Sequence, residues 1–468
     1  MIRLNVKAAA AKAAAIGAAL AVAASAIAIS SSSPAQADPQ SASALVVVGS
    51  DTTQSVMNAM AGFENGINYT PIQSDLEPTK TQLVSWNALN PDPFGDACIT
   101  PKVKAATIYR SNGSSEGRRA LSRGIQNAQY GGNTGTAPAT FTTGTGGVCG
   151  SPGRSTAGIV DIARSSSGIT SAGTALTYIP FGRDALSFAY YRPAGAPASV
   201  PTLTSAQLQS MFGASGGPTR IGGVRYIPCG IQLGSGTYQS WRGMVAGGSD
   251  ANDQAATLYC QGYTGTVDGV TVQARLQEHD GDGLKYKGDL AVQQSAGSPA
   301  PPVADGATGN TAYNEANSVF IVGYSAGVFV SQANGVAIDR IPQADIAAGK
   351  WDLGRIDALG ASYTVTDGVY SPAAGQFSSD TYGRDVYNVV DTNRLQDEFG
   401  DLGMKGLLVS TDLGKPAVPG VRADHVAAIC SDAAQETVNK FGFLSIPTRC
   451  GSTQLTGALV VGSNPLQP

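Results

Sequence analysis

Short apolar runs alternate with segments of helical spacing along the first part of the chain. Residues 44–48 are continuously apolar, which predicts a strand buried on both faces. Residues 54–63 follow with apolar side chains at helical spacing. Residues 105–109 and 116–125 repeat this strand and helix pattern, and residues 159–163 begin a third unit. The alternation predicts an α/β fold with mostly parallel strands.

Later segments predict how the chain is organised as a whole. Residues 185–191 and 386–390 are strongly β-like, and each is expected to cross between two lobes. Residues 204–212 predict a helix that begins at a Thr or Ser cap. Residues 432–441 predict a late helix that closes the first lobe.

Four short turns rich in glycine and hydroxyl side chains lie next to these predicted elements. They are residues 49–53 (GSDTT), 111–115 (SNGSS), 164–168 (RSSSG) and 234–237 (GSGT), and each lies between an apolar run and a helix-like segment. A helix N-terminus has unpaired N–H groups and a partial positive charge, and small hydroxylated residues let the backbone approach an anion. One such turn is commonly just a helix cap. Four of them predict several helix ends that converge on one small anion.

The first 37 residues have the pattern of a secretory signal. Arg3, Lys7 and Lys12 form the basic region, an apolar stretch follows, and Ala35-Gln36-Ala37 is a small-residue cleavage site. An uncleaved anchor helix is the alternative, but the stretch is short and Ala-rich. No cysteine lies near the cleavage site, so no lipid attachment is expected there, and no later run is long and apolar enough to cross a membrane. We therefore expect a secreted protein.

Charge narrows the class of partner. The 468 residues include 30 basic and 34 acidic side chains, for a net charge of −4, and loss of the three basic residues of the signal changes this to −7. A mildly acidic surface argues against nucleic acid as a partner. An anion site on such a chain must act through local dipoles rather than through the total charge.

The six cysteines predict disulfides, because their number is even and the chain is expected to be exported. We favour pairing of neighbours along the chain because each pair then closes a loop of modest length. The expected pairs are Cys98 with Cys149, Cys229 with Cys260, and Cys430 with Cys450. There is no C-x-x-C and only two histidines are present, so neither a metal nor another cofactor is expected.

In several segments the chain resembles the phosphate-type periplasmic solute-binding proteins, which capture substrate for ATP-driven importers. It is most similar to their exported actinobacterial relatives. No single matching segment is specific, and the resemblance depends on their order and spacing. The segments are 48–54 (VGSDTTQ), 110–115 (RSNGSS), 161–166 (DIARSS), 180–185 (PFGRDA), 203–208 (LTSAQL), and 234–237 (GSGT) with Trp241.

The resemblance implies a two-lobed α/β fold of the type II periplasmic-binding-protein kind. Two mostly parallel sheets, flanked by helices, would be joined by a two-strand hinge. The signal peptide would be residues 1–37, lobe I residues 42–186 with a return at 384–468, and lobe II residues 187–383. The resemblance also implies a non-enzymatic protein that holds a small oxyanion, with phosphate favoured, and an ABC permease as a further partner. Separately from the resemblance, we expect a monomer.

The resemblance places the ligand-binding residues in the four turns. They would be Thr52, Thr53, Ser114, Ser115, Ser165, Ser166, Ser235, Gly236 and Thr237. Two family features are missing: Ser166 stands where the family has an Asp that accepts a proton from phosphate, and Ile231 stands where it has an Arg. Arg164 is our candidate for the lost cation, with Arg110 as a second.

The missing carboxylate bears on ligand choice. An ionised carboxylate can only accept hydrogen bonds, so it favours protonated phosphate, which carries an O–H, over fully ionised sulfate, which carries none. Without a replacement that discrimination would be lost. Glu116, Glu278 and Asp280 are the candidates to replace it.

Other segments support different functions. Residues 323–327 (GYSAG) follow a strand-like run, so an α/β-hydrolase-like esterase with Ser325 as nucleophile and His425 as base is an alternative. Against it, no HGGG-type oxyanion loop is visible. A third possibility is an exported surface protein that kept the fold without a ligand. Residues 278–283 (EHDGDG) predict a solvated loop, or else a cleft loop in which Glu278 or His279 touches the ligand.

Overall fold

The computed structural model describes residues 44–89, 98–103, 105, 107–125, 158–295 and 315–460. The expected signal peptide lies outside these ranges, and so does Cys149. Within them, no helix combines the length and the apolar character that a membrane span requires.

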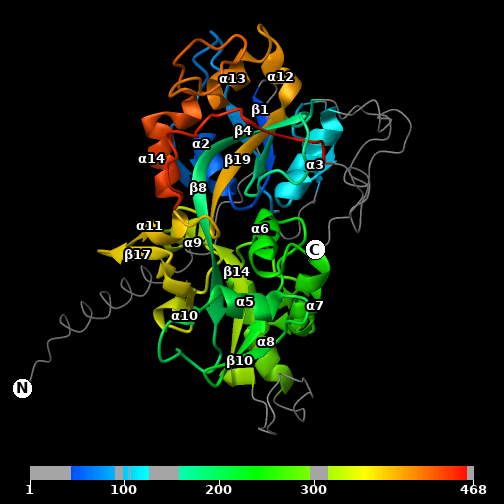
Figure 1. Ribbon diagram of the computed structural model, residues 1–468, viewed down its shortest axis with the longest axis vertical. Coiled ribbons are helices and arrows are strands. Elements are labelled where there is room, and N and C mark those ends of the chain that lie inside the picture. The colour runs from blue at the N-terminus through cyan, green and yellow to red at the C-terminus, as the bar shows by residue number, and fades with distance from the viewer. Residues whose placement is uncertain are drawn as a thin grey trace, which may run out of the picture. The chain divides into compact units, whose positions relative to one another are not determined.

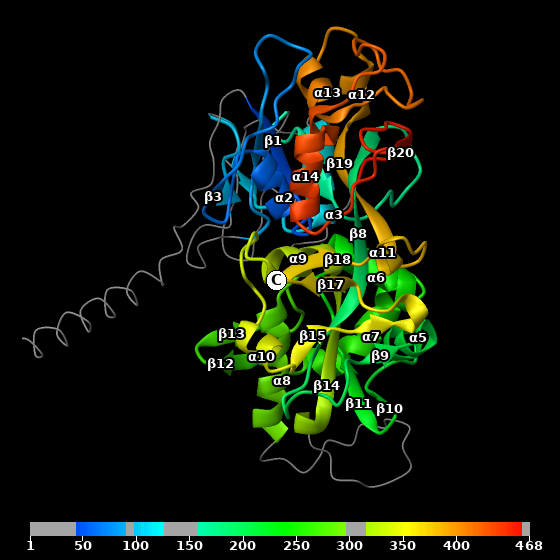
Figure 2. The same ribbon diagram turned by 90° about the vertical axis from the view of Figure 1, so that its left-hand side faces the viewer.

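Two long antiparallel strands connect two groups of elements (Figures 1 and 2). They are β8 (Leu176–Tyr191) and β19 (Gly383–Asp391), which pair along all of β19 with one irregularity between Val386 and Tyr387. Beyond β19 the sheet continues through β7 (Ile162–Ser165), β1 (Leu45–Gly49) and β4 (Leu83–Ser85). Beyond β8 it continues through β14 (Ser318–Ser325), β11 (Val224–Pro228) and β10 (Thr219–Ile221).

The first lobe is built on β1, whose side chains alternate between two apolar cores. Val47 packs with helices α2 (Gln54–Met60), α13 (Leu402–Leu408) and α14 (Asp432–Lys440). Val46 and Val48 pack on the opposite face with α3 (Ser114–Ile125). All five residues of β1 are therefore buried, which is why the run has no polar alternation.

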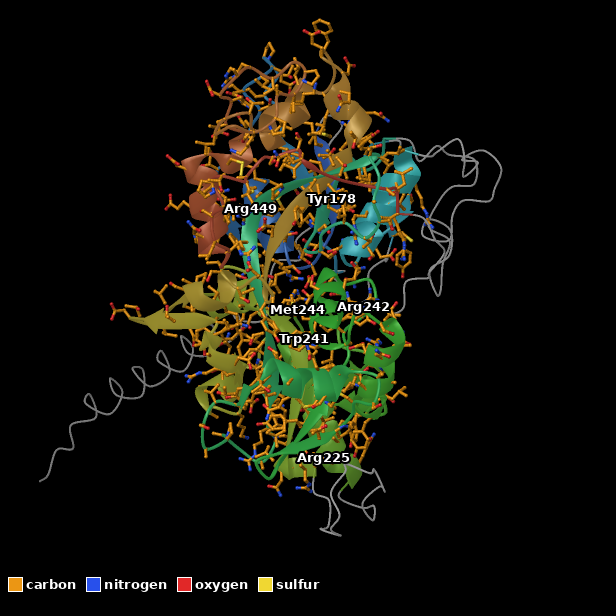
Figure 3. All side chains as sticks on the ribbon, viewed as in Figure 1. Tyr178, Arg225, Trp241, Arg242, Met244 and Arg449 are labelled. Carbon is orange, nitrogen blue, oxygen red and sulfur yellow. A yellow bond between two sulfur atoms is a disulfide. The ribbon has the colours of Figure 1, made fainter. Side chains whose placement is uncertain are left out.

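The second lobe repeats this arrangement on β14. Its Val319 and Ile321 pack with α5 (Ser205–Phe212) and α6 (Gly236–Val245), where Trp241 meets Phe212 edge to face at 5.6 Å. Figure 3 labels Trp241 in this lobe. Its alternate residues pack with α8 (Gly281–Ser295) and α9 (Ala326–Ala333). Trp241 is thus a core residue of this lobe.

The remaining elements are short, apart from α7. They are β2 (Phe63–Glu64), β3 (Ile67–Asn68), β5 (Cys98–Ile99), β6 (Ile108–Tyr109), β9 (Thr202–Leu203), α7 (Asp250–Gln261), β12 (Gly265–Val267), β13 (Val270–Val272), η1 (Glu315–Asn317), α10 (Gln343–Ala347), β15 (Trp351–Leu353), β16 (Arg355–Ile356), η2 (Asp357–Leu359), β17 (Tyr363–Thr366), β18 (Val369–Pro372), α11 (Ala374–Phe377), α12 (Thr392–Gln396), η3 (Ala428–Cys430) and β20 (Leu455–Gly457).

The predicted two-lobed α/β class is confirmed, and the sheet is more mixed than expected. The pairs β1–β4, β1–β7 and β11–β14 are parallel, whereas β8 is antiparallel to β14, β15, β19 and β20. The two expected sheets are one ten-stranded sheet in the described residues. The reason is the length of β8, in which every residue except Arg183 is buried, so that it pairs with strands of both lobes.

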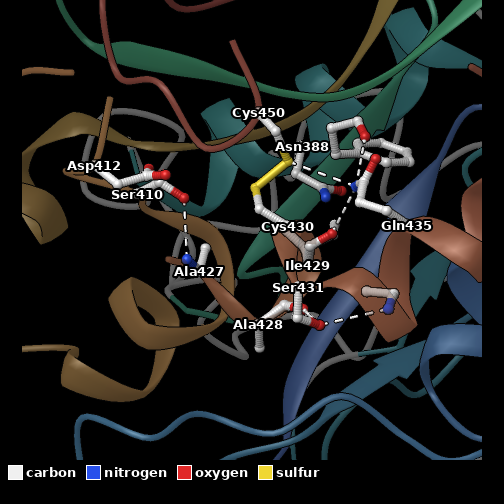
Figure 4. Close-up of a disulfide and its surroundings, with 12 residues drawn as sticks. Asn388, Ser410, Asp412, Ala427, Ala428, Ile429, Cys430, Ser431, Gln435 and Cys450 are labelled. Atoms are coloured by element: carbon white, nitrogen blue, oxygen red, sulfur yellow. Dashed lines mark hydrogen bonds between the residues drawn. A yellow bond between two sulfur atoms is a disulfide. The ribbon is translucent and has the colours of Figure 1, made fainter. Parts of the chain in front are cut away.

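Two of the expected disulfides are present, Cys229–Cys260 and Cys430–Cys450. The second ties η3 to the segment that follows α14 (Figure 4). The Gln435 amide lies beside it and donates to the Ile429 carbonyl at 2.8 Å. The third expected pair involves Cys149, which lies outside the described residues.

Candidate functional site

Three of the four hydroxyl-rich turns lie next to one another in the first lobe. The first follows β1 and the third ends β7, and these two strands are parallel neighbours, so both turns lie at the same edge of the sheet. The second turn opens α3 and is bridged to the first through Asn112 and Gly49. The fourth opens α6 of the second lobe.

The third turn corrects one sequence expectation. We expected a helix after it, but β7 passes through the turn to β8. Ser165 closes the turn locally, because its hydroxyl donates to the Ser167 carbonyl at 2.7 Å. Helices α2, α3 and α6 therefore begin at turns whose hydroxyls meet one another, whereas the third turn joins two strands.

Five hydroxyls from the four turns lie within hydrogen-bonding distance of one another. Ser166 Oγ is central, 3.1 Å from Ser50 Oγ, 2.9 Å from Thr52 Oγ1 and 3.3 Å from Ser114 Oγ. Thr237 Oγ1 of the second lobe lies 3.3 Å from Thr52 Oγ1. All five residues are buried. We call this group, together with the Thr237 N–H, the hydroxyl cradle.

Two glycines permit this close approach of the lobes. A Cβ atom on Gly236 would stand 2.1 Å from Ser114 Oγ and 2.3 Å from Ser166 Oγ. Gly113 has φ of +110°, and a Cβ there would stand 2.3 Å from the Gly234 carbonyl oxygen. Any larger residue at either position would push the turns apart.

A carboxylate already lies in the cradle. Glu278 Oε1 accepts hydrogen bonds from Thr52 Oγ1 at 2.8 Å and from the Thr237 N–H at 3.1 Å. Its second oxygen, Oε2, is buried and has no hydrogen-bond partner among the described residues. The side chain is thus held at the N-terminus of α6, where the helix favours negative charge. The expectation of a solvated loop here is wrong, since Glu278 and His279 are 1% and 2% exposed.

His279 connects the cradle to an ion pair between the lobes. Its Nε2 lies 3.3 Å from Thr237 Oγ1, and its Nδ1 lies 3.2 Å from Asp51 Oδ2. Arg340 donates to both oxygens of Asp51, at 2.9 and 3.0 Å. Burial alone would raise the pKa of Asp51, but Arg340 and the His279 hydrogen bond outweigh it and hold that pKa below its ordinary value. The φ of His279 is +56°, an uncommon conformation that the surrounding contacts must maintain.

The guanidinium that touches the cradle comes from the strand between the lobes. Arg384 of β19 donates to Thr237 Oγ1 at 2.7 Å and to Asp184 Oδ2 at 2.9 Å. Asp184 and Arg384 are directly opposite in the β8–β19 ladder. Sequence reasoning missed Arg384, because only the strand register, which is a long-range property, brings it to the turns.

Arg164, our candidate for the lost cation, lies behind the first turn instead. It is fully buried and donates to the carbonyls of Ser50, Gly49 and Trp86 and to Ser85 Oγ. Burial lowers its pKa to about 9, against the opposing effect of nearby carboxylates. The second candidate, Arg110, donates to the carbonyl of Asn87.

The other predicted turn residues have supporting positions. Ser235 caps α6 by accepting from the Tyr238 N–H at 2.9 Å. Ser115 accepts from the Gln239 side chain of the second lobe, and its N–H donates to the Gly234 carbonyl at 3.2 Å. Thr53 Oγ1 is buried without a partner among the described residues. Ser115 therefore contributes to the seam between the lobes, and Ser235 orders the helix that carries Thr237.

The GYSAG segment has a structural role. Ser325 donates to Asp184 Oδ1 at 2.8 Å and caps α9 by accepting from the Val328 N–H at 3.1 Å. Its φ of −75° is ordinary, unlike the strained turn of a nucleophile elbow. His425 lies beside Asp75, so the described residues form no serine, histidine and acid array around Ser325.

The glycines of this segment are explained by packing. A Cβ on Gly323 would stand 2.6 Å from the Trp241 ring, and one on Gly327 would stand 2.9 Å from the Gly442 carbonyl oxygen. The G-x-S-x-G spacing therefore reflects close contacts in the core of the fold.

Neutral amide side chains complete the contact between the lobes around the cradle. Asn112 bonds to Gln232 at 2.7 Å and to Gln277 at 2.9 Å. Gln239 accepts from Arg118 at 3.0 Å and from Ser167 Oγ at 2.9 Å. The lobes are thus closed on the cradle by hydrogen bonds that separation would expose to water.

No protein-family model and no curated protein gives a significant match to this chain. Similar solved structures exist at low identity. A putative phosphate ABC transporter substrate-binding protein with bound phosphate from Clostridium perfringens shares 11% identity over 86% of this chain and 99% of its own, with a TM-score of 0.38. A possible phosphate-binding protein from Planctomyces limnophilus shares 12% identity over 87% and 94%, with a TM-score of 0.34. A high-affinity periplasmic phosphate-binding protein of the DING type, bound with phosphate, shares 10% identity over 86% and 91%, with a TM-score of 0.32. The function is therefore argued below from the cradle's own contacts.

Proposed function

We propose that the protein is a non-catalytic receptor that captures a small oxyanion, phosphate in the first instance, between its two lobes. One observation carries the proposal: the Glu278 carboxylate is held by the Thr52 hydroxyl and the Thr237 N–H. Hydroxyls and helix-terminal amides are the donors that bind anions in proteins. The cradle already offers such donors to one anionic oxygen.

Burial and a nearby cation support the same proposal. The cradle hydroxyls are shielded from water, so hydrogen bonds to a ligand there face no competition from solvent. The Arg384 guanidinium donates to the Thr237 hydroxyl, so a positive charge lies next to the cradle. The unpartnered Glu278 Oε2 is placed to accept a proton from a protonated oxyanion, which would replace the Asp absent at Ser166.

Entry of a ligand requires the lobes to separate, because the cradle residues are buried when the lobes are closed. β8 and β19 are the strands that would bend, as in hinge closure around a ligand. Secretion of the protein and delivery of the ligand to an ABC permease are further parts of this proposal.

Calorimetry on the purified mature protein tests the proposal, with phosphate, arsenate, sulfate and molybdate titrated in turn. We expect binding of phosphate and arsenate. The Thr52→Val variant should bind at least tenfold more weakly, because about 1–3 kcal/mol is lost when a buried partner is left unpaired. Thr177→Val is the matched control, since it removes a buried hydroxyl whose partner is Thr392 in α12. Absence of heat with every anion would reject the proposal.

The same carboxylate also favours a second candidate, a protein that kept the fold without a ligand. In that case Glu278 would be the permanent occupant of the cradle donors. The two candidates differ in a native mass spectrum of the purified protein incubated with phosphate. A bound phosphate supports the receptor, whereas its absence together with silent calorimetry supports the second candidate.

A further inference from the structure

We propose that Arg340 positions the first turn against the second lobe through Asp51, and that this ion pair sets how long a bound anion stays between the lobes. We call the pair of Asp51 and Arg340 the latch. The inference rests on the proposed receptor function, because it concerns release of the ligand from the same cradle. It gives a role to two residues whose side chains are not part of the cradle.

The Asp51 carboxylate belongs to the first lobe, but its hydrogen-bond partners in the described part of the chain belong to the second. Arg340 Nη2 lies 2.9 and 3.0 Å from its two oxygens, and His279 Nδ1 lies 3.2 Å from Oδ2. The Asp51 side chain is 1% exposed. Separation of the lobes would therefore remove all of these contacts together.

Arg340 is held in position by its own lobe. Its Nη1 donates to the Glu278 carbonyl at 3.3 Å, and its own carbonyl accepts from the Asp282 N–H at 3.0 Å. These contacts orient the guanidinium before the lobes meet. Less conformational freedom is therefore lost when it pairs with Asp51.

The balance of charge and burial favours the closed pair. Burial of Asp51 opposes its ionisation, but Arg340 and His279 outweigh this effect and hold the pKa of Asp51 below its ordinary value. The Arg340 side chain is 22% exposed, so it keeps part of its contact with water while it is paired. The desolvation penalty of a buried ion pair is reduced on the arginine side, and the latch stabilises closure.

A cavity borders the latch, so side-chain packing contributes little to the contact between the lobes at this place. Both lobes line it, with Asp51, Ser55, Phe441 and Phe443 from the first and Ser331, Gln332 and Arg340 from the second. The ion pair is therefore the contact that holds the lobes together beside this cavity.

The contacts around the second turn are of a different kind. There the lobes meet through neutral amides, such as Asn112 with Gln232 at 2.7 Å and with Gln277 at 2.9 Å. Hydrogen bonds between charged groups contribute roughly twice as much as such neutral ones. The latch should therefore dominate the resistance to opening.

Small-angle X-ray scattering of the purified mature protein tests the latch without any ligand. The Arg340→Gln variant should have a larger radius of gyration than the wild type, because its lobes are held together less tightly. Arg394→Gln is the matched control. Arg394 is 24% exposed and pairs with Asp161 and Asp401 inside the first lobe, so its loss should leave the radius unchanged.

Stopped-flow kinetics with phosphate tests the consequence for the ligand. Phosphate should leave Arg340→Gln at least about tenfold faster than it leaves Arg394→Gln, while the association rates stay within about threefold, because loss of a buried charge pair acts mainly on dissociation. Arg340→Lys keeps the charge and should release phosphate more slowly than Arg340→Gln. Equal release from these two variants would contradict the role of the ion pair.

A second variant keeps the test decisive if Arg340→Gln folds poorly. Asp51→Asn combined with Arg340→Gln leaves no buried carboxylate without a cation, and it should expand and release phosphate faster in the same way. The inference is overturned if both variants keep the wild-type radius of gyration. An expanded Arg340→Gln in a protein that binds no phosphate would reject the receptor function and leave the latch standing.

Discussion

A single methyl group at Gly236 should disable the cradle. Gly236 belongs to the second lobe, and a Cβ there would stand 2.1 and 2.3 Å from the hydroxyls of Ser114 and Ser166 in the first lobe. Serine side chains are too short to bend away, so both hydroxyls would have to rotate out of their hydrogen bonds. The Gly236→Ala variant therefore tests whether the cradle needs this close approach.

The cost can be worked out from the contacts that would be lost. Ser114 Oγ would no longer accept from the Ser166 N–H, and Ser166 Oγ would no longer accept from Ser50 Oγ. Each buried group left without its partner costs about 1–3 kcal/mol, so the two together cost about 3 kcal/mol. Because the clash exists only when the lobes are closed, the cost applies to ligand binding, and anion affinity should fall by about two orders of magnitude.

The assay is calorimetry with phosphate on Gly236→Ala beside Gly243→Ala. Gly243 lies in the same helix, and a Cβ there would meet nothing within 4 Å, so its substitution changes helix propensity alone. Thermal unfolding should be nearly unchanged in both variants. The reasoning is refuted if Gly236→Ala binds phosphate within about threefold of Gly243→Ala.

Three further predictions concern other parts of the chain. Ser325→Ala should lower the free energy of unfolding by about 1 kcal/mol through loss of the α9 cap, and should leave phosphate binding intact; a Ser325-dependent esterase activity would contradict it. Burial lowers the pKa of Lys287 to about 8, from 10.5 in the unfolded chain, so the unfolded state binds more protons between these two pH values and the free energy of unfolding should rise with pH across that window. Urea unfolding should show this rise in the wild type and lose it in Lys287→Met. An identical rise in both proteins would refute the assignment. Removing the disulfide by Cys430→Ser with Cys450→Ser should cost about 3 kcal/mol, because the bond closes a loop with a sequence separation of 20, and an unshifted denaturant midpoint would contradict this.

Local signals in the sequence were sufficient for many elements of the fold. The apolar run of β1 follows from burial on both faces, and α5 begins at Thr204, whose side chain accepts from the Gln207 N–H as the capping pattern requires. The continuity of the sheet through β8 did not follow, because strand pairing depends on contacts far apart in the chain.

The candidate site likewise contains residues that local sequence predicts and residues that depend on long-range contacts. Hydroxyl-rich turns are local features, and the structure brings residues of all four turns together. Arg384 reaches Thr237 only through the register of β19 against β8, which no spacing in the sequence reveals. Residues 278–283 predict either a solvated loop or a cleft loop, and the sequence does not decide between them because the groups that donate to Glu278 come from other segments.

Because β8 is shared by both lobes, it affects the order of folding during synthesis and the stability of fragments of the chain. The first lobe draws β19, α14 and β20 from the last part of the chain, and β20 pairs with the first residues of β8. During synthesis its core therefore stays incomplete until about residue 457 has emerged, long after the second lobe has been made. A fragment that ends before β19 would expose the unpaired edge of β8 and should aggregate rather than persist as an autonomous half.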